Sequence, residues 1–242
     1  MFNNTLILGI FSSLDKPIWD WLELLLIPLL LALLGWFITW KNNKNEREIT
    51  KNKSLQESFD SYLEFMSKLI LENDMANSDD HKVPIIARAR TINFLDSADS
   101  EKRGLVLQFL AETNLICAPN PIINLNGINL NKTKLRNIRL EKISLKGVHL
   151  KNCDFKGANL KGSDFTSSNF ENCNLSNSNL ENSNLTYADM ENVNLTNGNL
   201  VKATIDGTNF KQAKMENCLV TKTQFNIIIR EKSLKSKPKT NE

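Results

Sequence analysis

The sequence predicts a mainly β protein, in which a solenoid of five-residue repeats follows a long apolar run and a short α-helical segment. Two observations carry this prediction. An apolar residue stands at every fifth position from Leu125 to Phe225, and residues 18–40 are almost entirely apolar. A period of five matches neither a helix nor a strand. It therefore indicates a solenoid, in which each unit buries its apolar face only by stacking on its neighbours.

Changes in composition divide the chain into five segments. They are a short N-terminal segment, a transmembrane helix, a helical stalk and cap, the repeat solenoid, and a C-terminal cap with a basic tail: 1–17, 18–40, 41–118, 121–226 and 227–242. The whole chain carries 30 basic and 27 acidic residues, a net charge of +3. This balance by itself predicts no strongly charged partner.

The run IWDWLELLLIPLLLALLGWFITW, residues 18–40, predicts one transmembrane helix. Its 23 residues extend about 35 Å at about 1.5 Å per residue, more than the roughly 30 Å hydrocarbon layer. No charge occurs from Leu24 to Trp40, and tryptophans mark both ends of the run. The alternative is a buried helix of a soluble protein, but a helix apolar on every face needs more protein around it than this chain offers.

The charges that flank this run predict its orientation. Lys41, Lys44 and Arg47 follow it, whereas the charges on its N-terminal side are three acids and one base: Asp15, Lys16, Asp20 and Glu23. The positive-inside rule then places the N-terminus outside and the C-terminal domain in the cytoplasm. We therefore expect a single-pass membrane protein whose residues 18–40 have the lipid bilayer as their partner.

The middle of the chain predicts helices. Residues 45–72 carry apolar side chains at helical spacing and continue the first helix as a stalk. A second helix is expected near 85–95, and a third begins after Asp99 or Ser100, either of which can cap it. One face of the third helix should hold four apolar side chains: Leu105, Val106, Phe109 and Leu110.

The charged residues of this middle segment form no recognisable binding motif. Arg88 and Arg90 precede the run Glu101, Lys102 and Arg103, which mixes both signs of charge. Mixed charges of this kind are typical of a solvated face. We interpret these five residues as solvated.

The repeat block consists of 21 units of five residues without an insertion. The fifth residue of each unit is apolar, the third is small or apolar, and the fourth is Asn or Asp in 13 of the 21 units. Residues twenty apart should form ladders, such as Leu140, Leu160 and Leu180. Cys153 and Cys173 are also twenty apart at inward positions, so we expect stacked thiols that pack in the core.

This block resembles the pentapeptide-repeat family, whose motif is A-(D/N)-L-x-x; the units KGANL (156–160) and TYADM (186–190) come closest to it. The resemblance implies a right-handed quadrilateral β-helix with four units per coil. Twenty-one units then give about five coils and a rod about 25 Å long. Residues 88–116 and 16–34 are similar to segments of membrane-attached bacterial pentapeptide-repeat proteins, especially cyanobacterial ones, which largely lack an assigned activity.

Two sets of residues are candidates for contacts. The first set occupies the same outward place in four consecutive units and should ring one coil: Lys146, Lys151, Lys156 and Lys161. These lysines either meet an anionic partner, a protein or lipid head groups, or only keep the surface soluble. The second set follows the last repeat and should cap the solenoid or, as we favour, form a homodimer: Ile227, Ile228 and Ile229. We expect disorder from Arg230 onward.

These features favour a non-enzymatic scaffold or protein-interaction module with an unidentified protein partner. The chain shows no nucleophile–base arrangement, phosphate loop or Cys-x-x-Cys pair, so we expect no catalytic residue, cofactor or metal site. One alternative is a DNA mimic that binds topoisomerases, a role that the resemblance to the pentapeptide-repeat family implies for some of its members. That role needs an anionic rod, whereas 121–226 carries a net charge of +4. We therefore expect no nucleic-acid or DNA-mimic function. A further alternative is a subunit of a membrane assembly.

Overall fold

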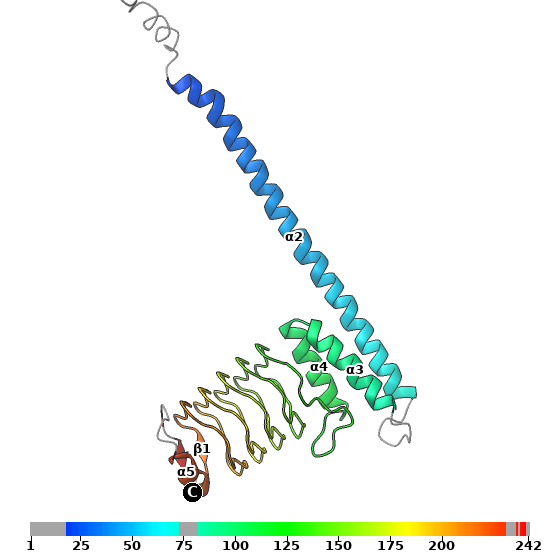
Figure 1. The fold of residues 1–242 in the computed structure, drawn as a ribbon, viewed down its shortest axis with the longest axis vertical. Helices are drawn as coiled ribbons and strands as arrows, with labels where there is room; N and C mark the ends of the chain where they lie inside the picture. The colour runs from blue at the N-terminus through cyan, green and yellow to red at the C-terminus, as the bar shows by residue number, and fades with distance from the viewer. Residues whose placement is uncertain (1–17, 73–81, 231–235, 237, 241–242) are drawn as a thin grey trace, which may run out of the picture. The chain divides into compact units, whose positions relative to one another are not determined.

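The computed structural model describes residues 18–72, 82–230, 236 and 238–240, with side chains described from residue 29 onward. The elements are α2 (Ile18–Glu72), α3 (Lys82–Ser97), α4 (Ser100–Glu112), β1 (Leu219–Val220), α5 (Lys222–Ile228) and β2 (Lys239–Thr240). Between α4 and β1 the chain runs through stacked coils (Figure 1). These coils are the predicted solenoid.

The first helix does not end where the predicted membrane span ends. α2 continues unbroken through residue 40 to Glu72, which confirms the predicted helical stalk.

Within the part of the chain that the structure describes, no helix is long and apolar enough to cross a membrane. The apolar side chains described there, residues 29–40, extend only about 18 Å at about 1.5 Å per residue. The rest of the predicted span, 18–28, lies outside the described side chains, so the described residues do not support a transmembrane helix over 18–40.

The end of α2 and the next two helices form the cap that precedes the solenoid. Tyr62 of α2 is buried, with its ring centroid 4.9 Å from that of Phe94 on α3, and its hydroxyl lies 2.9 Å from that of Thr91. α4 begins after Asp99, whose carboxylate accepts a hydrogen bond from the backbone N–H of Lys102, as the sequence predicted. Of the predicted apolar face, Val106 and Leu110 are buried and Phe109 packs partly buried against the core. Leu105 is instead exposed, and Leu107 is buried in its place.

Twenty residues make one coil of the solenoid. Isolated parallel β-bridges join residues twenty apart, for example Asp154 to Asn174 and Asn174 to Asn194. On the side 171–175, the N–H of Asn174 donates to Cys153 O of the preceding coil at 3.0 Å. Two N–H groups donate to the next coil, Asn172 to Glu191 O at 3.0 Å and Leu175 to Asn194 O at 2.7 Å. Each coil therefore has four units, one per side. We name the sides by the units of the third coil: side A 161–165, side B 166–170, side C 171–175 and side D 176–180.

The polar residues of each unit make the turns between sides. The second residue has a positive φ, near 60°, and is most often Asn or Gly, the residues that reach this region at least cost. The side chain at the fourth position accepts a hydrogen bond from the backbone N–H two residues on, as when Asn179 Oδ1 accepts from Glu181 at 3.0 Å. This bond satisfies a backbone donor at the turn and explains the frequency of Asn and Asp there.

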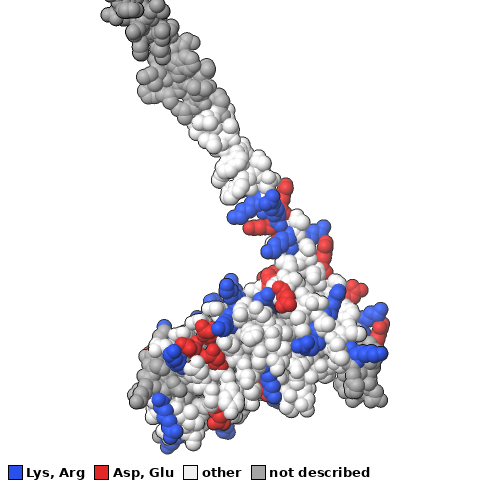
Figure 2. Space-filling model, viewed as in Figure 1, with Lys and Arg blue, Asp and Glu red and all other residues white. Residues whose placement is uncertain are grey.

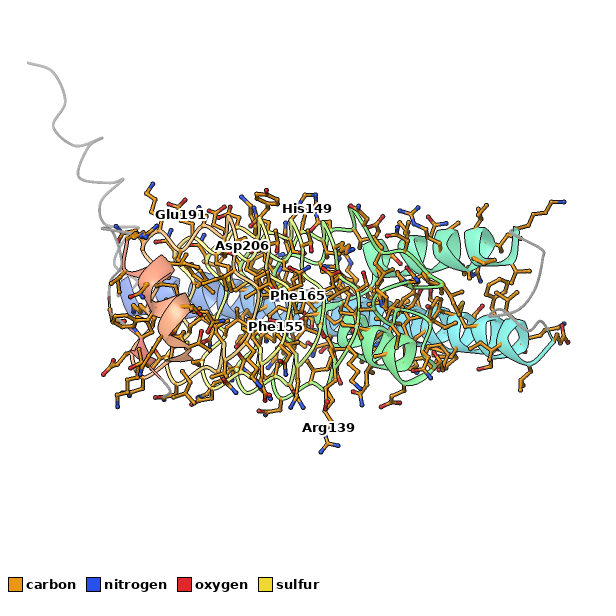
Figure 3. The ribbon with its side chains drawn as sticks, turned by 90° about the horizontal axis from the view of Figure 1, so that it is seen from below. Arg139, His149, Phe155, Phe165, Glu191 and Asp206 are labelled. Carbon is orange, nitrogen blue, oxygen red and sulfur yellow. The ribbon has the colours of Figure 1, made fainter. Side chains whose placement is uncertain are left out.

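The third and fifth residues of the units fill the interior, as predicted. Leu140, Leu160, Leu180 and Leu200 form one fully buried ladder. Phe170 packs against Phe155 and Phe165 in the centre, with ring centroids 5.9 and 5.1 Å from its own. Figure 3 shows Phe155 and Phe165 inside the stack of coils. The fold is therefore a β-helix-type solenoid with a continuous apolar core.

The first coil departs from this regularity at side A. No bridge joins 121–125 to 141–145; instead Cys117 pairs with Ile143 in an antiparallel bridge, and Ser144 donates its N–H to Ile116 O at 2.7 Å. The chain that leaves α4 thus occupies the edge of the second coil. The large side chains Ile123 and Ile143, at third positions where most units have a small residue, are buried beside it.

The cap is attached to the first coil by two arginines. Arg88 donates from Nε to Asn124 O at 2.6 Å, and Arg103 donates to Leu95 O and to Asn131 O. Carbonyl groups of the first coil have no preceding coil to pair with, so a guanidinium group supplies the missing donor. The prediction that these two arginines are merely solvated is therefore wrong.

The C-terminal end is a cap as well. The last predicted unit, 221–225, does not form a side of a coil, because α5 begins at Lys222. Gln224 donates from Nε2 to Leu200 O and to Ala203 O, both at 2.7 Å, and Ile228 is fully buried. Ile227 and Ile229 are 43% and 40% exposed. The three isoleucines thus divide between core and surface, and the capping alternative describes them better than the dimer that the sequence favoured.

The prediction of a disordered tail is wrong for the tail residues that the structure describes. β2 pairs in parallel with β1, and Lys239 donates its N–H to Cys218 O at 2.8 Å. Ser236 pairs with Lys214, one side earlier. The tail continues the coil-to-coil ladder and covers the edge that the last coil would otherwise expose.

A pair of serines on side A tests the packing of the core. The Ser183 hydroxyl is buried and has no hydrogen-bond partner among the described residues, whereas Ser163 Oγ donates to Leu140 O at 2.7 Å. We predict that Ser183→Ala raises the free energy of unfolding by about 1 kcal/mol and that Ser163→Ala lowers it by about 1–2 kcal/mol. Urea denaturation of the two variants measures both; equal losses would contradict this account.

The isoleucines of α5 give a second prediction. Replacing the buried Ile228 by Ser should cost about 3 kcal/mol, because it removes apolar contacts and buries a hydroxyl in their place. The matched change Ile227→Ser should cost less than about 0.5 kcal/mol, because that side chain is already exposed to water. Thermal unfolding followed by circular dichroism compares the two, and similar losses would contradict the capping role.

Candidate interaction surface of the solenoid

Contacts with a partner must be made by the first, second and fourth residues of the units, because the third and fifth are buried. The four lysines of the predicted ring stand at first positions, and the structure distributes them over all four sides: Lys161 on A, Lys146 on B, Lys151 on C and Lys156 on D. They therefore form a ring in sequence order but no patch on one side. A flat partner could reach only one or two of them at a time.

Three of these lysines are paired with acidic residues of the next coil. Lys146 Nζ lies 3.1 Å from Asp164, Lys161 Nζ lies 3.1 Å from Glu181, and Lys151 pairs with Glu171. The Lys151–Glu171 contact raises the pKa of the lysine and lowers the pKa of the carboxyl group, through a hydrogen bond and charge attraction. Sequence spacing could have revealed two of the three pairs, since their members are twenty apart. These lysines mainly connect coils.

Other basic residues of the first two coils lack an ion pair among the residues described. They are Lys132, Lys134, Arg139, Lys142 and Lys156. All five are exposed, whereas Arg136 pairs with Asp154. Of the predicted ring, only Lys156 belongs to this set. The sequence-based selection therefore missed four cations that are freer to meet an anionic group.

Charge is also unevenly distributed along the solenoid. Residues 132–161 contain nine basic and two acidic side chains, whereas 164–191 contain five acidic side chains and no basic one. Figure 2 shows both signs side by side on the visible face of the coils. The ion pairs described above join the basic stretch to the acidic one, so part of each charge is neutralised within the protein.

The described residues show no arrangement typical of a metal site or a catalytic site. No group of three or more His, Cys, Asp and Glu side chains there could hold a metal ion. Hollows of about 640 Å³ beside Glu46 and Arg47 and of about 380 Å³ beside Glu101 are open on the surface, and their lining side chains contain no histidine or cysteine. His149 lies on side B, opposite Arg139 on side D (Figure 3), and no polar partner of its imidazole is described. These features provide no catalytic arrangement.

The cysteines take part in packing, as predicted. Cys153 and Cys173 are buried on side C, and their thiols donate to Leu130 O and Leu150 O at 3.0 and 2.7 Å. Burial raises the pKa of Cys173, and it raises the pKa of Cys218 to about 12. Neutral thiols in such surroundings are poor nucleophiles and poor metal ligands.

The family comparison agrees with this geometry. The model of the family described as pentapeptide repeats matches the chain in overlapping copies that together span residues 123–221. Over residues 123–221 the chain is therefore similar to the pentapeptide-repeat family. Among curated proteins no match to the chain was found. Pentapeptide-repeat proteins are generally structural or interaction proteins and not enzymes, and nothing in the described residues indicates catalytic activity.

Solved pentapeptide-repeat structures resemble part of the chain. One is a protein of the thylakoid lumen of Arabidopsis thaliana, with 25% identity over 45% of this chain and 75% of that one, at a TM-score of 0.28. Another is alr5209 from Nostoc PCC 7120, with 23% identity over 45% of this chain and 84% of alr5209, at a TM-score of 0.31. A third is QnrB1, a plasmid-mediated fluoroquinolone resistance protein, with 14% identity over 50% of this chain and 75% of QnrB1, at a TM-score of 0.23.

Thiol reactivity checks the burial of the repeat cysteines. In the native protein a thiol reagent such as Ellman's reagent should modify only Cys117, which is partly exposed, whereas the unfolded chain should present all four thiols. The variant Cys117→Ser should show no rapid reaction before unfolding. Rapid modification of two or more thiols in the folded wild type would mean that the repeat interior is open to solvent.

Proposed function

We propose that the protein is a non-enzymatic scaffold, whose pentapeptide-repeat solenoid binds other proteins through its outward side chains. One observation supports this proposal most directly: the coil-to-coil ladder holds polar side chains in aligned rows on each side. Asn199 Nδ2 donates to Asn179 Oδ1 at 3.3 Å on side D, and Asn194 Nδ2 donates to Asn174 Oδ1 at 3.5 Å on side C. Rows fixed in this way lose little conformational entropy when a partner binds.

We further propose that the protein is attached to a membrane. This attachment is supported by the exposure of apolar side chains around α2 from Leu29 to Trp40, with Trp36 66% exposed. A helix apolar on every face needs an apolar environment on every face, which a bilayer supplies and a single partner helix does not. The basic residues from Lys41 onward suit the cytoplasmic side. The protein would then present its solenoid to the cytoplasm, alone or as a subunit of a membrane assembly.

Charge favours this proposal over mimicry of DNA. The net charge of +4 over 121–226 is opposite to that of a nucleic acid. An anionic protein or lipid head groups could instead meet the cations that lack ion pairs, such as Arg139 and Lys156. In contrast, the lysines that pair with acidic residues of the next coil would have to break those pairs first.

Site-specific crosslinking tests the scaffold proposal. A photo-crosslinking phenylalanine analogue is placed in the full-length protein in cells at one outward position per side: Ser167, Asn172, Asn177 or Asn182. Tyr187 shows that such a position accommodates an aromatic residue. We expect specific adducts from at least one side and none from the analogue at buried Phe170. Absence of adducts from all four sides would contradict the proposal, and full release of the protein by alkaline carbonate would contradict membrane attachment alone.

A further inference from the structure

Tyr187 is an outlier on the surface of the solenoid. It has a φ of 57° and is 70% exposed. The other second positions with a positive φ hold Asn, Gly, Lys, Ser or Gln. A bulky aromatic residue is unfavourable in this left-handed region, and an exposed ring regains little through burial. Folding alone therefore does not account for a tyrosine at this position.

The ring is presented as an open platform on the edge of side B. A Cβ atom at Gly207 would lie 2.5 Å from Tyr187 Cδ1, so the ring extends over the glycine of the next coil. The other residues in this row are also small: Gly127, Gly147 and Ser167. Because no large side chain of the row stands beside the ring, a partner can approach it.

Two acidic residues neighbour Tyr187, one across the ladder and one along the chain. The N–H of Tyr187 donates to Asp206 O at 2.9 Å, and the Asp206 side chain is exposed with no ion pair among the residues described. Asp189, two residues after the tyrosine, accepts hydrogen bonds from Asn169 Nδ2 at 3.2 Å and from Asn209 Nδ2 at 2.9 Å. These amides fix the Asp189 carboxylate without neutralising its charge.

We propose that Tyr187, with Asp189 and Asp206, forms a docking surface for a basic, arginine- or lysine-bearing segment of a partner protein. An aromatic face attracts a guanidinium or ammonium group, and a neighbouring carboxylate can accept its N–H groups. An acidic segment would be repelled. This inference rests on the proposed scaffold function and names one of its contact surfaces and the chemistry of the partner.

The positions of other charged residues and of the tail bear on this docking surface. Figure 3 shows Asp206 and His149 toward one side of the solenoid and Arg139 at the other. The basic tail of the chain does not occupy the surface where it is described, because Ser236 and Lys239 pair with Lys214 and Leu219 on sides C and D. These described tail residues are therefore not the occupant, and we assign that place to a segment of another protein.

Binding of a defined basic probe tests the inference. A fluorescein-labelled peptide of ten arginines is titrated into the full-length protein in a neutral detergent, and anisotropy gives the dissociation constant. We expect Tyr187→Ser and Asp206→Asn each to weaken binding at least fivefold. Serine occupies the equivalent place in the preceding coil, so the first variant should fold normally. The matched control is Glu216→Gln, which removes an acidic charge on side D and should change binding less than twofold.

Chemical modification supplies a second readout. The chain has two tyrosines, and Tyr62 is buried, so tetranitromethane should nitrate Tyr187 alone. The arginine peptide should protect Tyr187, and a peptide of ten glutamates should not. Equal affinity of all variants, or nitration unchanged by the arginine peptide, would overturn the docking surface. Crosslinked adducts elsewhere on the solenoid would still support the scaffold function.

Discussion

The backbone hydrogen bond from one coil to the next is the interaction on which this structure depends. Each unit offers only five residues and cannot bury its apolar side chains alone. When residues twenty apart pair, as Asn174 pairs with Asp154 and Asn194, the inward residues of all coils come into register and make one core. The same pairing aligns the outward residues in rows. Stability and surface therefore have a common origin.

A ladder of this kind has two open ends, and the protein closes each differently. At the start, Arg88 and Arg103 donate to backbone carbonyls of the first coil, while the segment after α4 pairs with the second coil. At the finish, Gln224 donates to Leu200 O, at the end of the fourth coil, and to Ala203 O of the fifth, and β2 pairs with the edge of the fifth coil. Closed ends protect the solenoid from pairing with other chains, which leaves its sides for recognition.

The period of five was enough to predict the solenoid, its inward residues and the stacked thiols, because each follows from a local repeat. Features set by long-range contacts were not predictable in the same way. Arg88 has no motif that reveals Asn124 as its acceptor, and Ser236 lies outside any repeat. The lysine ring shows the limit most clearly: equal spacing predicted a common role, but ion pairs with the next coil separate Lys151 and Lys161 from Lys156.

Amide hydrogen exchange in the third coil measures the ladder most directly. Asn174 and Leu175 donate to neighbouring coils, whereas Ser176 donates to the side chain of Asn174, which is partly exposed. The account predicts that the first two amides exchange only on global unfolding and that the Ser176 amide exchanges much faster, with the same alternation recurring every five residues. Uniformly fast exchange through 161–180, or protection with a helical period, would contradict the ladder.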